Sequence, residues 1–333
     1  MTKITGAKIV VIGGGTGSFT LLSGIKNYVS DVTAIVNMAD DGGSTGQLRD
    51  EFGVLPPGDV RQCLVALSES PKVRDLFNYR FSEGSLKGHA FGNIFLSALE
   101  QMTGNFAEAI EVADEVLNVQ GKVIPVTLNN VQLVLKSRDG TNILGQHVIN
   151  NMSFNKNDER PVLELSPKAK LNPSAKQAIE SADMVVIAPG SLYGSLAPAL
   201  IVNGMKQALL ATKARVVYVC NLVTKPGQSE NFSVADYADE IERFIGAPRL
   251  DYVLYNTELP SKTLLNRYAL QKEFGVEVKT QELKQKHYKA VGKKICAKEV
   301  KTAVKGDIIA HTRSFIRHDS DALARQLMKV YFS

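Results

Sequence analysis

Short runs of β-branched and apolar residues recur along the chain without the polar alternation of a half-exposed strand. Runs of this kind are typical of strands that are buried on both faces of a parallel sheet. Glycines or polar residues follow most of them, and stretches with helical spacing come next, so the pattern predicts repeated strand–helix units. The predicted strands are 8–12, 32–36, 183–188, 215–219 and 251–255.

Amphipathic and apolar stretches with helical spacing lie between and after these strands. The predicted helices are 18–28, 60–68, 71–78, 91–103, 105–118, an apolar helix after Ser191 that runs to about Leu210, and 319–331. The sequence Pro56-Pro57-Gly58-Asp59 signals a helix start, with Asp59 predicted as the N-cap. Strand patterns at 122–127 and 131–136 predict a β-hairpin, and 150–158 is predicted to be a loop.

This alternation indicates an α/β fold with an open, doubly wound sheet. We expect one α/β domain over 1–333, in which a helix-rich insertion of about 56–120 interrupts the sheet. The composition is ordinary for a globular protein, with 44% hydrophobic and 22% charged residues, and its three cysteines fit a reducing compartment. A signal-peptide pattern and an apolar run of about 20 residues are both missing. We therefore expect a cytoplasmic protein without membrane insertion.

The net charge of +5 is concentrated in one segment. Residues 281–305 hold eight Lys and two Glu, so the rest of the chain is close to neutral. A local strip is not the basic face that nucleic-acid binding requires, and Tyr288 is its one aromatic ring. We expect no nucleic-acid partner. The strip is interpreted as solvated surface, with attraction of an anionic nucleotide as the alternative.

The first candidate ligand site is the sequence Gly13-Gly14-Gly15-Thr16-Gly17, between a predicted strand and helix. Glycines let backbone N–H groups approach a phosphate, and a helix N-terminus adds partial positive charge. The match to a dinucleotide fingerprint is imperfect, because Ser18 and Asn37 stand where a glycine and an acid are usual. This loop therefore predicts a nucleotide or sugar-phosphate contact. The alternative is a tight strand–helix turn, and a dehydrogenase is a distant third reading.

Two further loops are expected at the same edge of the sheet. The segment 37–46 carries the adjacent acids Asp40 and Asp41 together with Ser44. Adjacent carboxylates repel unless a cation, a donor or solvent relieves them, so Mg²⁺ ligation or hydrogen bonding to a ribose or base is predicted, with an exposed turn as the alternative. Gly190, Ser191 and Ser195 follow a buried strand and predict a second anion site.

Several long motifs stand in a fixed order: GGGTGS, ADDGGSTGQLRDEFGVLPPGDVRQ, GHAFGN, APGSLYGS and NLVTKPGQS. In order and spacing they resemble the gluconeogenesis factor family, a branch of the CofD-like (2-phospho-L-lactate transferase) superfamily, over residues 6–330. The resemblance implies a Rossmann-like α/β/α fold, a cytoplasmic location, a need for the protein in cell shape during gluconeogenic growth, and binding of UDP-sugars such as UDP-N-acetylglucosamine. Transferase relatives use Mg²⁺.

Carried over residue by residue, the resemblance makes Asp40 and Asp41 the acidic pair of the site. It assigns nucleotide or phosphate contacts to Gly13, Gly14, Gly15, Thr16, Gly17, Gly190, Ser191, Tyr193, Ser195, Asn221, Thr224, Tyr268 and Arg317. This sequence departs from the expected motifs at Gly194, where the family has Thr, at Lys225, where it has Gln, and at Gln228, where it has Glu. An amide cannot act as a base, so no catalytic role is expected at Gln228.

Two functions of different classes follow. The first is a regulatory protein that binds a UDP-sugar or another nucleotide diphosphate without turnover, because no base or nucleophile stands out beside the glycine loops. A regulatory protein partner and homo-oligomer formation are expectations of that reading. The alternative is a Mg²⁺-dependent phosphotransferase of the 2-phospho-L-lactate transferase type, in which one acid holds Mg²⁺ and the other accepts a hydroxyl proton.

Overall fold

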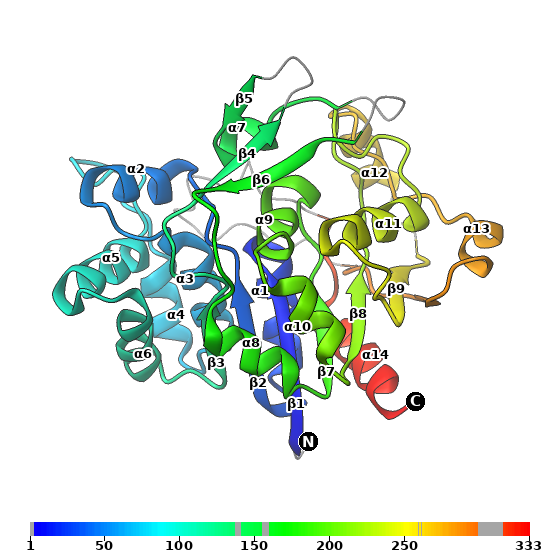
Figure 1. Cartoon of the computed structure of the whole chain (residues 1–333), viewed down its shortest axis with the longest axis horizontal. Coiled ribbons are helices and arrows are strands. Elements are labelled where there is room, and N and C mark those ends of the chain that lie inside the picture. The colour runs from blue at the N-terminus through cyan, green and yellow to red at the C-terminus, as the bar shows by residue number, and fades with distance from the viewer. Residues whose placement is uncertain (1–2, 137–140, 155–159, 259, 261, 299–315) are drawn as a thin grey trace.

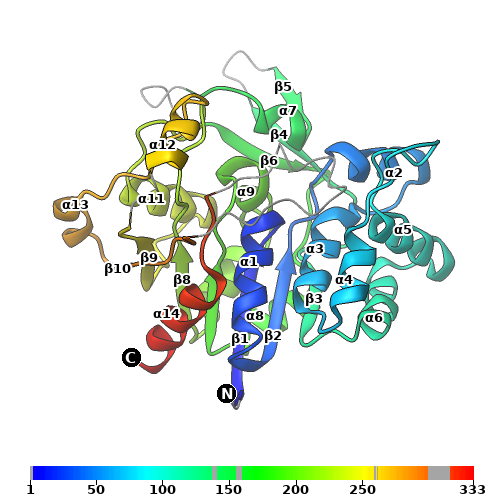
Figure 2. The same cartoon turned by 180° about the vertical axis from the view of Figure 1, so that it is seen from behind.

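The computed structural model describes residues 3–136, 141–154, 160–258, 260, 262–298 and 316–333. Its centre is a seven-stranded parallel sheet in the order β10-β9-β8-β7-β1-β2-β3, with helices on both faces (Figures 1 and 2). The strands are β1 (Ile4–Gly13), β2 (Val29–Val36), β3 (Lys122–Pro125), β7 (Met184–Ile187), β8 (Arg215–Val219), β9 (Tyr252–Asn256) and β10 (Lys289–Lys293). The Rossmann-like prediction is confirmed, and β10 is a strand that the sequence did not reveal.

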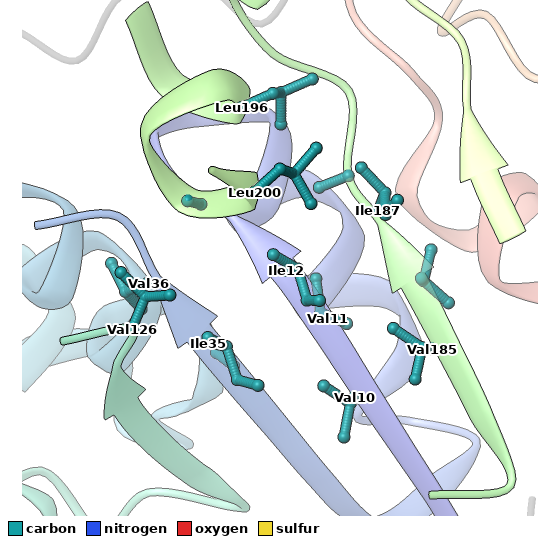
Figure 3. Packing of buried hydrophobic residues seen from close by; sticks show 14 of the residues in the cluster. Val10, Val11, Ile12, Ile35, Val36, Val126, Val185, Ile187, Leu196 and Leu200 are labelled. Atoms are coloured by element: carbon teal, nitrogen blue, oxygen red, sulfur yellow. The ribbon is translucent and has the colours of Figure 1, made fainter. Parts of the chain in front are cut away.

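The core of the molecule lies along the two central strands. Ile9–Ile12 of β1 and Met184–Ile187 of β7 are at most 2% exposed, which explains why these runs lack polar alternation. Figure 3 shows their side chains packing with Ile35 of β2 and with Leu196 and Leu200, which cover the carboxyl end of the sheet. Burial on both faces therefore fixes the position of the loops that leave these strands.

Helices cover the two faces unequally. On one face, α1 (Gly15–Ile25) packs against α3 (Pro57–Leu67) and α14 (Ser320–Phe332) (Figure 2); on the other, α8 (Pro173–Glu180) packs against α10 (Met205–Ala211), near α11 (Val234–Ile245) (Figure 1). The remaining described helices, apart from α7, which is described below, are α2 (Gly43–Phe52), α4 (Pro71–Asn78), α5 (Phe91–Thr103), α6 (Phe106–Leu117), α9 (Ala197–Leu200), α12 (Lys262–Ala269), α13 (Thr280–Lys284) and the π-helix η1 (Leu192–Leu196).

Most predicted helices are confirmed, and the differences lie at glycines. The predicted helix after Ser191 begins as the π-helix η1 and continues directly into α9, and it is separated from α10 by residues 201–204, where Gly204 adopts a φ of 103°. The glycines at 43 and 46 lie inside α2 rather than in a loop. Helices α2 to α6 lie between β2 and β3, and their apolar residues join the main core. That 1–333 forms a single domain stays a prediction.

The predicted hairpin of 122–127 and 131–136 is wrong. The first strand, β3, pairs in parallel with β2 at the edge of the main sheet. The second, β4 (Gln132–Lys136), pairs antiparallel with β5 (Asn142–Leu144) and β6 (Val162–Ser166) in a separate three-stranded sheet. Asn129 does not close a tight turn, since its side chain accepts a hydrogen bond from Lys170 N. The apolar strand β3 gains more from burial beside β2 than a two-stranded ribbon would provide.

The small sheet and α7 (Gln146–Asn150) lie over the carboxyl ends of the central strands, at the top of Figure 1. The described part of the predicted loop, 151–154, follows α7 directly, and 155–158 falls outside the described residues. Helices in the described ranges are all too short or too polar to cross a membrane. The architecture therefore places a cover of its own over the edge at which ligands bind in α/β sheets.

Candidate functional site

The chain changes direction across the sheet between β1 and β7, and this switch point brings two of the predicted loops into contact. A Cβ atom at Gly17 would lie 1.7 Å from the carbonyl oxygen of Pro189. The first turn of α1 therefore touches the backbone that follows β7. Open α/β sheets bind their ligands at such switch points, outside the carboxyl ends of the strands.

Asp59 occupies the first glycine loop. Its Oδ1 accepts a hydrogen bond of 2.9 Å from Gly15 N, and a Cβ at Gly14 would lie 2.2 Å from its Oδ2. The prediction of Asp59 as an N-cap is wrong, because α3 begins at Pro57 and the carboxylate instead satisfies an amide at the start of α1. The Gly15 amide is therefore not open to a phosphate as the simple glycine-loop reading assumed. Thr16 is exposed beside it.

The acid that faces Asp59 is Asp40. A Cβ at Gly58 would lie 3.1 Å from Asp40 Oδ2, so the Asp40 side chain reaches the start of α3. Burial, and then the Asp40 charge, raise the pKa of Asp59 to about 7. Burial also raises the pKa of Asp40, against hydrogen bonds from Gly42 and Thr45. Asp40 and Asp59 thus form an acid pair.

The Asp41 carboxylate faces α7 instead, and the role of Asp40 and Asp41 as the acidic pair of the site stays a prediction. Its carboxylate accepts hydrogen bonds from Gln146 N at 2.9 Å and from His147 N at 2.6 Å. Both amides belong to the first turn of α7, where a negative charge is stabilising. Asp41 therefore holds the covering helix in place, and both of its oxygens are engaged there.

Ser44 lies in a buried polar network rather than in an open loop. Its Oγ is 3.1 Å from His89 Nδ1 and accepts a hydrogen bond of 3.2 Å from Asn93 Nδ2. Arg61 Nε in turn donates to Asn93 Oδ1 at 2.8 Å. His89 is itself buried and takes part in this network as a structural histidine. The network ties the first turn of α2 to α3 and α5.

The loops after β7 and β8 are joined through Asn221. Gly190 N donates to Asn221 Oδ1 at 3.1 Å, and Asn221 Nδ2 returns a 2.8 Å hydrogen bond to Gly190 O. Ser191 and Ser195 are partly buried beside this pair. Tyr193, in contrast, is 1% exposed, and its ring packs edge-on against Phe154 and Phe244. Its predicted ligand contact is therefore not supported, since π-helix η1 turns the ring into the core.

The other predicted contacts after β8 also have partners within the chain. Thr224 is buried, and its Oγ1 accepts a hydrogen bond from Phe274 N at 3.1 Å. Tyr268 is 4% exposed in a small cluster with Cys296, and its Oη accepts from Ile316 N at 3.0 Å. The backbone oxygen of Arg317 accepts from Ala297 N at 2.8 Å. The structure does not bring Thr224 or Tyr268 to an open surface beside the switch point.

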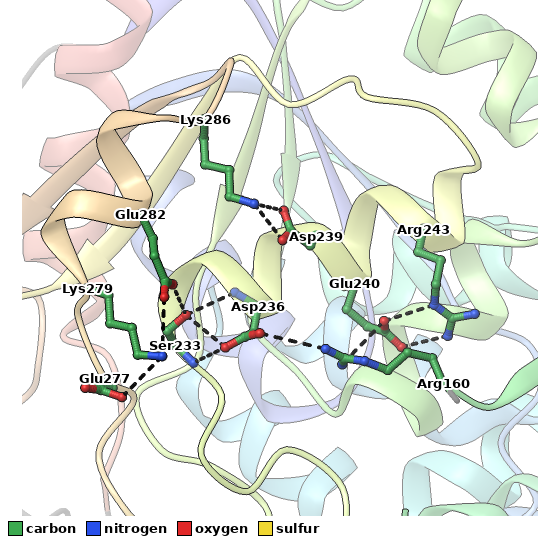
Figure 4. Close-up of polar contacts among 10 residues, drawn as sticks. All are labelled: Arg160, Ser233, Asp236, Asp239, Glu240, Arg243, Glu277, Lys279, Glu282 and Lys286. Carbon is green, nitrogen blue, oxygen red and sulfur yellow. Dashed lines mark hydrogen bonds and ion pairs between the residues drawn. The ribbon is translucent and has the colours of Figure 1, made fainter. Parts of the chain in front are cut away.

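A charged network on α11 fixes the elements around this region (Figure 4). Glu240 is 2% exposed and contacts Arg243 at 2.7 Å and Arg160 at 3.6 Å. Burial and the Glu240 charge raise the pKa of Tyr193. Lys286, in the lysine-rich strip, pairs with Asp239 at 2.6 Å. At least part of the strip is therefore neutralised by α11, while residues 299–305 fall outside the described ranges.

Asp40 and Asp59 place two carboxylates beside the first glycine loop. Mg²⁺ is usually held by one or two carboxylates, with the remaining positions filled by water and substrate phosphates. In the described ranges, no group of three His, Cys, Asp or Glu side chains could hold a metal. Mg²⁺ binding at these two carboxylates therefore stays a prediction, in which a phosphate-bearing ligand and water would supply the further ligands.

The sheet order and the polar residues at its switch point define a Rossmann-like α/β protein with a buried acid pair beside a glycine loop. The family model described as 2-phospho-L-lactate transferase CofD matches residues 9–296. The chain belongs to the CofD family.

Curated and solved relatives are similar over most of their length. The chain is 35% identical to the "Gluconeogenesis factor" of Bacillus subtilis over 323 residues, covering 96% of this chain and 97% of the relative. It is 42% identical to the "Gluconeogenesis factor" of Listeria innocua over 267 residues, covering 80% and 82% of the two chains. A crystal structure of a Bacillus halodurans protein is 34% identical with a TM-score of 0.85, covering 98% of this chain and 100% of that one.

Proposed function

We propose that this protein acts as a gluconeogenesis factor, a regulatory protein that binds a UDP-sugar such as UDP-N-acetylglucosamine and supports cell shape during gluconeogenic growth. The observation that carries the binding proposal is the contact between Gly17 and Pro189 at the switch point, with the Asp40–Asp59 pair beside it. A diphosphate at this edge would meet the partly buried hydroxyls of Ser191 and Ser195 in the second loop. It meets carboxylates at the first loop, so a divalent cation is needed to join the two. The name "Gluconeogenesis factor" of the relatives supports the gluconeogenic part of the proposal.

Nucleotide binding is expected to raise the thermal midpoint of the protein. Binding to the folded state stabilises it by mass action, by about 2.7 kcal/mol at a ligand concentration of 100 times Kd. We expect UDP-N-acetylglucosamine to raise Tm by several degrees, and more with Mg²⁺ than with EDTA, because the cation neutralises the acid pair. Differential scanning fluorimetry with UDP-N-acetylglucosamine, UDP-glucose, UDP, GDP and NAD measures this. The absence of a shift with every UDP-sugar at millimolar concentration would contradict the proposal.

A second candidate, a phosphotransferase of the 2-phospho-L-lactate transferase type, is favoured by the raised pKa of Asp59. A carboxyl group whose pKa is about 7 can take up a proton from an acceptor hydroxyl near neutral pH. Asp40 accepts hydrogen bonds from Gly42 and Thr45 that favour its charged form. Bound Mg²⁺ would neutralise phosphate charge, while the residues of this chain orient the ligand and hold the proton.

The Mg²⁺ dependence of binding should distinguish Asp40 from its neighbour. Asp40→Asn is expected to lose most of the ratio of nucleotide affinity with Mg²⁺ to that with EDTA, because one of two carboxylates is gone. Asp41→Asn is the matched control, and it should keep this ratio because its carboxylate faces α7. Isothermal titration calorimetry measures both ratios. Equal losses in the two variants would show that the cation is held by the sequence-adjacent pair after all.

A further inference from the structure

Two loops at the carboxyl edge of the sheet converge on a single oxygen of the covering helix. Ser191, in the loop after β7, donates from Oγ to Asn150 Oδ1 at 2.7 Å. Lys225, in the loop after β8, donates from Nζ to the same oxygen at 2.6 Å and also to the backbone oxygen of Asn150. A hydroxyl and an ammonium from separate loops therefore form one donor pair around the Asn150 amide.

The charge of this donor pair is not matched by its partner. Asn150 offers a neutral amide oxygen, whereas burial lowers the pKa of Lys225 to about 8, with the Glu273 charge opposing that shift. A partly buried ammonium is better compensated by an anionic oxygen, since charge-assisted hydrogen bonds are roughly twice as strong as neutral ones. A phosphate or carboxylate oxygen at the position of Asn150 Oδ1 would thus improve the match.

Helix α7 carries Asn150 to this position and is held at both ends by chain loops. Asp41 binds its first turn, and Gln228 Nε2 donates to the oxygens of Ile149 at 3.1 Å and Asn150 at 2.9 Å at its end. Gln146 Nε2 adds a 3.0 Å hydrogen bond to Gly194 O. Ile149 is fully buried in the main core and holds α7 itself in place, whereas the contacts of the Asn150 side chain are polar and can be exchanged for water or for a ligand at modest cost.

We propose that Ser191 and Lys225 form a binding subsite for an anionic oxygen, such as a phosphate of the ligand, and that Asn150 occupies this subsite as a stand-in supplied by the chain. The identity of the natural ligand rests on the proposed function, whereas the subsite itself does not. Lys225 stands where the motif resemblance places an amide. The subsite therefore gives this chain a stronger preference for an anionic ligand oxygen than a neutral amide at this position would give.

The proposal predicts competition between α7 and the anion. When a ligand must first displace Asn150, its apparent dissociation constant equals the intrinsic one divided by the fraction of molecules in which the subsite is open. Asn150→Ala removes the stand-in oxygen and should tighten anion binding about tenfold. Asn150→Asp places a carboxylate against Lys225 and should weaken it by a similar factor. Opposite effects at one position cannot arise from general destabilisation.

Calorimetric titration of the full chain with inorganic pyrophosphate tests the subsite without any nucleotide. Asn150→Ala should bind it more tightly than the wild type, and Asn150→Ala/Lys225→Met should lose that gain, while Asn150→Ala/Lys225→Arg should keep it. The matched control is Lys206→Met, which removes another lysine that donates to a carbonyl at a helix end, at Gly246 O. Circular dichroism confirms the fold of each variant.

Three outcomes would overturn the subsite: no binding to Asn150→Ala, equal binding by wild type and Asn150→Ala, or an Asn150→Ala gain that survives Lys225→Met. Because the probe has no base or sugar, its result is independent of the UDP-sugar proposal. If UDP-sugars fail to bind while the pyrophosphate series behaves as expected, only the proposed function falls.

Discussion

Asp59→Asn is expected to raise the free energy of unfolding by about 2–4 kcal/mol at pH 8 and to leave it nearly unchanged near pH 4. In the folded wild type the pKa of Asp59 is raised to about 7, first by burial and then by Asp40. The folded state therefore binds more protons than the unfolded state between about pH 4 and pH 7, and stability falls as the pH rises through that window. An amide at position 59 does not ionise, so the variant does not lose this stability as the pH rises.

The Asn side chain can keep the essential contact. Its oxygen can accept from Gly15 N, as Asp59 Oδ1 does at 2.9 Å, and its amide can donate toward Asp40. Burial also raises the pKa values of Glu100 and Asp114 to about 7, which gives a pH dependence of the same sign. These two groups are present in both proteins, so the difference between variant and wild type isolates Asp59.

Urea denaturation at pH 4 and pH 8 measures the effect. Glu51→Gln is the control, because its side chain is exposed on α2 and its neutralisation should change stability by no more than about 0.5 kcal/mol at either pH. A variant that is less stable than the wild type at pH 8, or equally shifted at both pH values, would show that Asp59 is a structural acid. If the variant is more stable than the wild type at pH 8, the Asp59 carboxylate destabilises the fold at that pH. Its presence is then best explained by a role in the candidate ligand site.

The main sheet could be predicted from the sequence because its central strands are buried on both faces. The runs at 8–12 and 183–188 are recognised as buried strands from their composition alone. Because these strands are parallel neighbours, the glycine loops that follow them meet at the carboxyl edge of the sheet. Strands with weaker patterns could not be placed. The sequence of β3 fits a hairpin as well as a sheet edge, and the choice is made by its distant partner β2.

The acid pair could not be predicted, for reasons of geometry. Asp40 and Asp41 are adjacent in sequence, but the Asp40 carboxylate accepts a hydrogen bond from Gly42 N nearby, whereas the Asp41 carboxylate accepts one from Gln146 N of α7, so the two side chains serve different parts of the structure. Asp59, the acid that faces Asp40, contacts Gly15 across 44 residues of sequence. A helix-capping rule that considers only neighbouring residues predicts Asp59 as the N-cap of α3, the helix in which it lies. The signal that could have found it is the motif in which Gly58 precedes Asp59, since a side chain at 58 would collide with Thr45.

Gly17→Ala is expected to destabilise the protein by about 3 kcal/mol or more and to abolish ligand binding at the switch point. The added Cβ would lie 1.7 Å from Pro189 O and 2.7 Å from Pro189 C, and both atoms belong to the backbone. A side chain could rotate out of the way, but a backbone carbonyl can move only with its loop. The first turn of α1 must therefore separate from the loop after β7, which also carries the Gly190–Asn221 hydrogen bonds.

Gly53→Ala is the matched control for this prediction, because it separates crowding from backbone strain. Gly53 has a φ of 70° but open space around its Cα, so alanine there should cost only about 1–2 kcal/mol. Urea denaturation of both variants, followed by nucleotide titration of each folded protein, gives the comparison. If Gly53→Ala is soluble and Gly17→Ala is insoluble, this difference would also support the larger destabilisation that we expect for Gly17→Ala. Equal losses of stability in the two variants would show that α1 and the loop after β7 can move apart freely. The contact between Gly17 and Pro189 would then not be what positions the two loops for ligand binding.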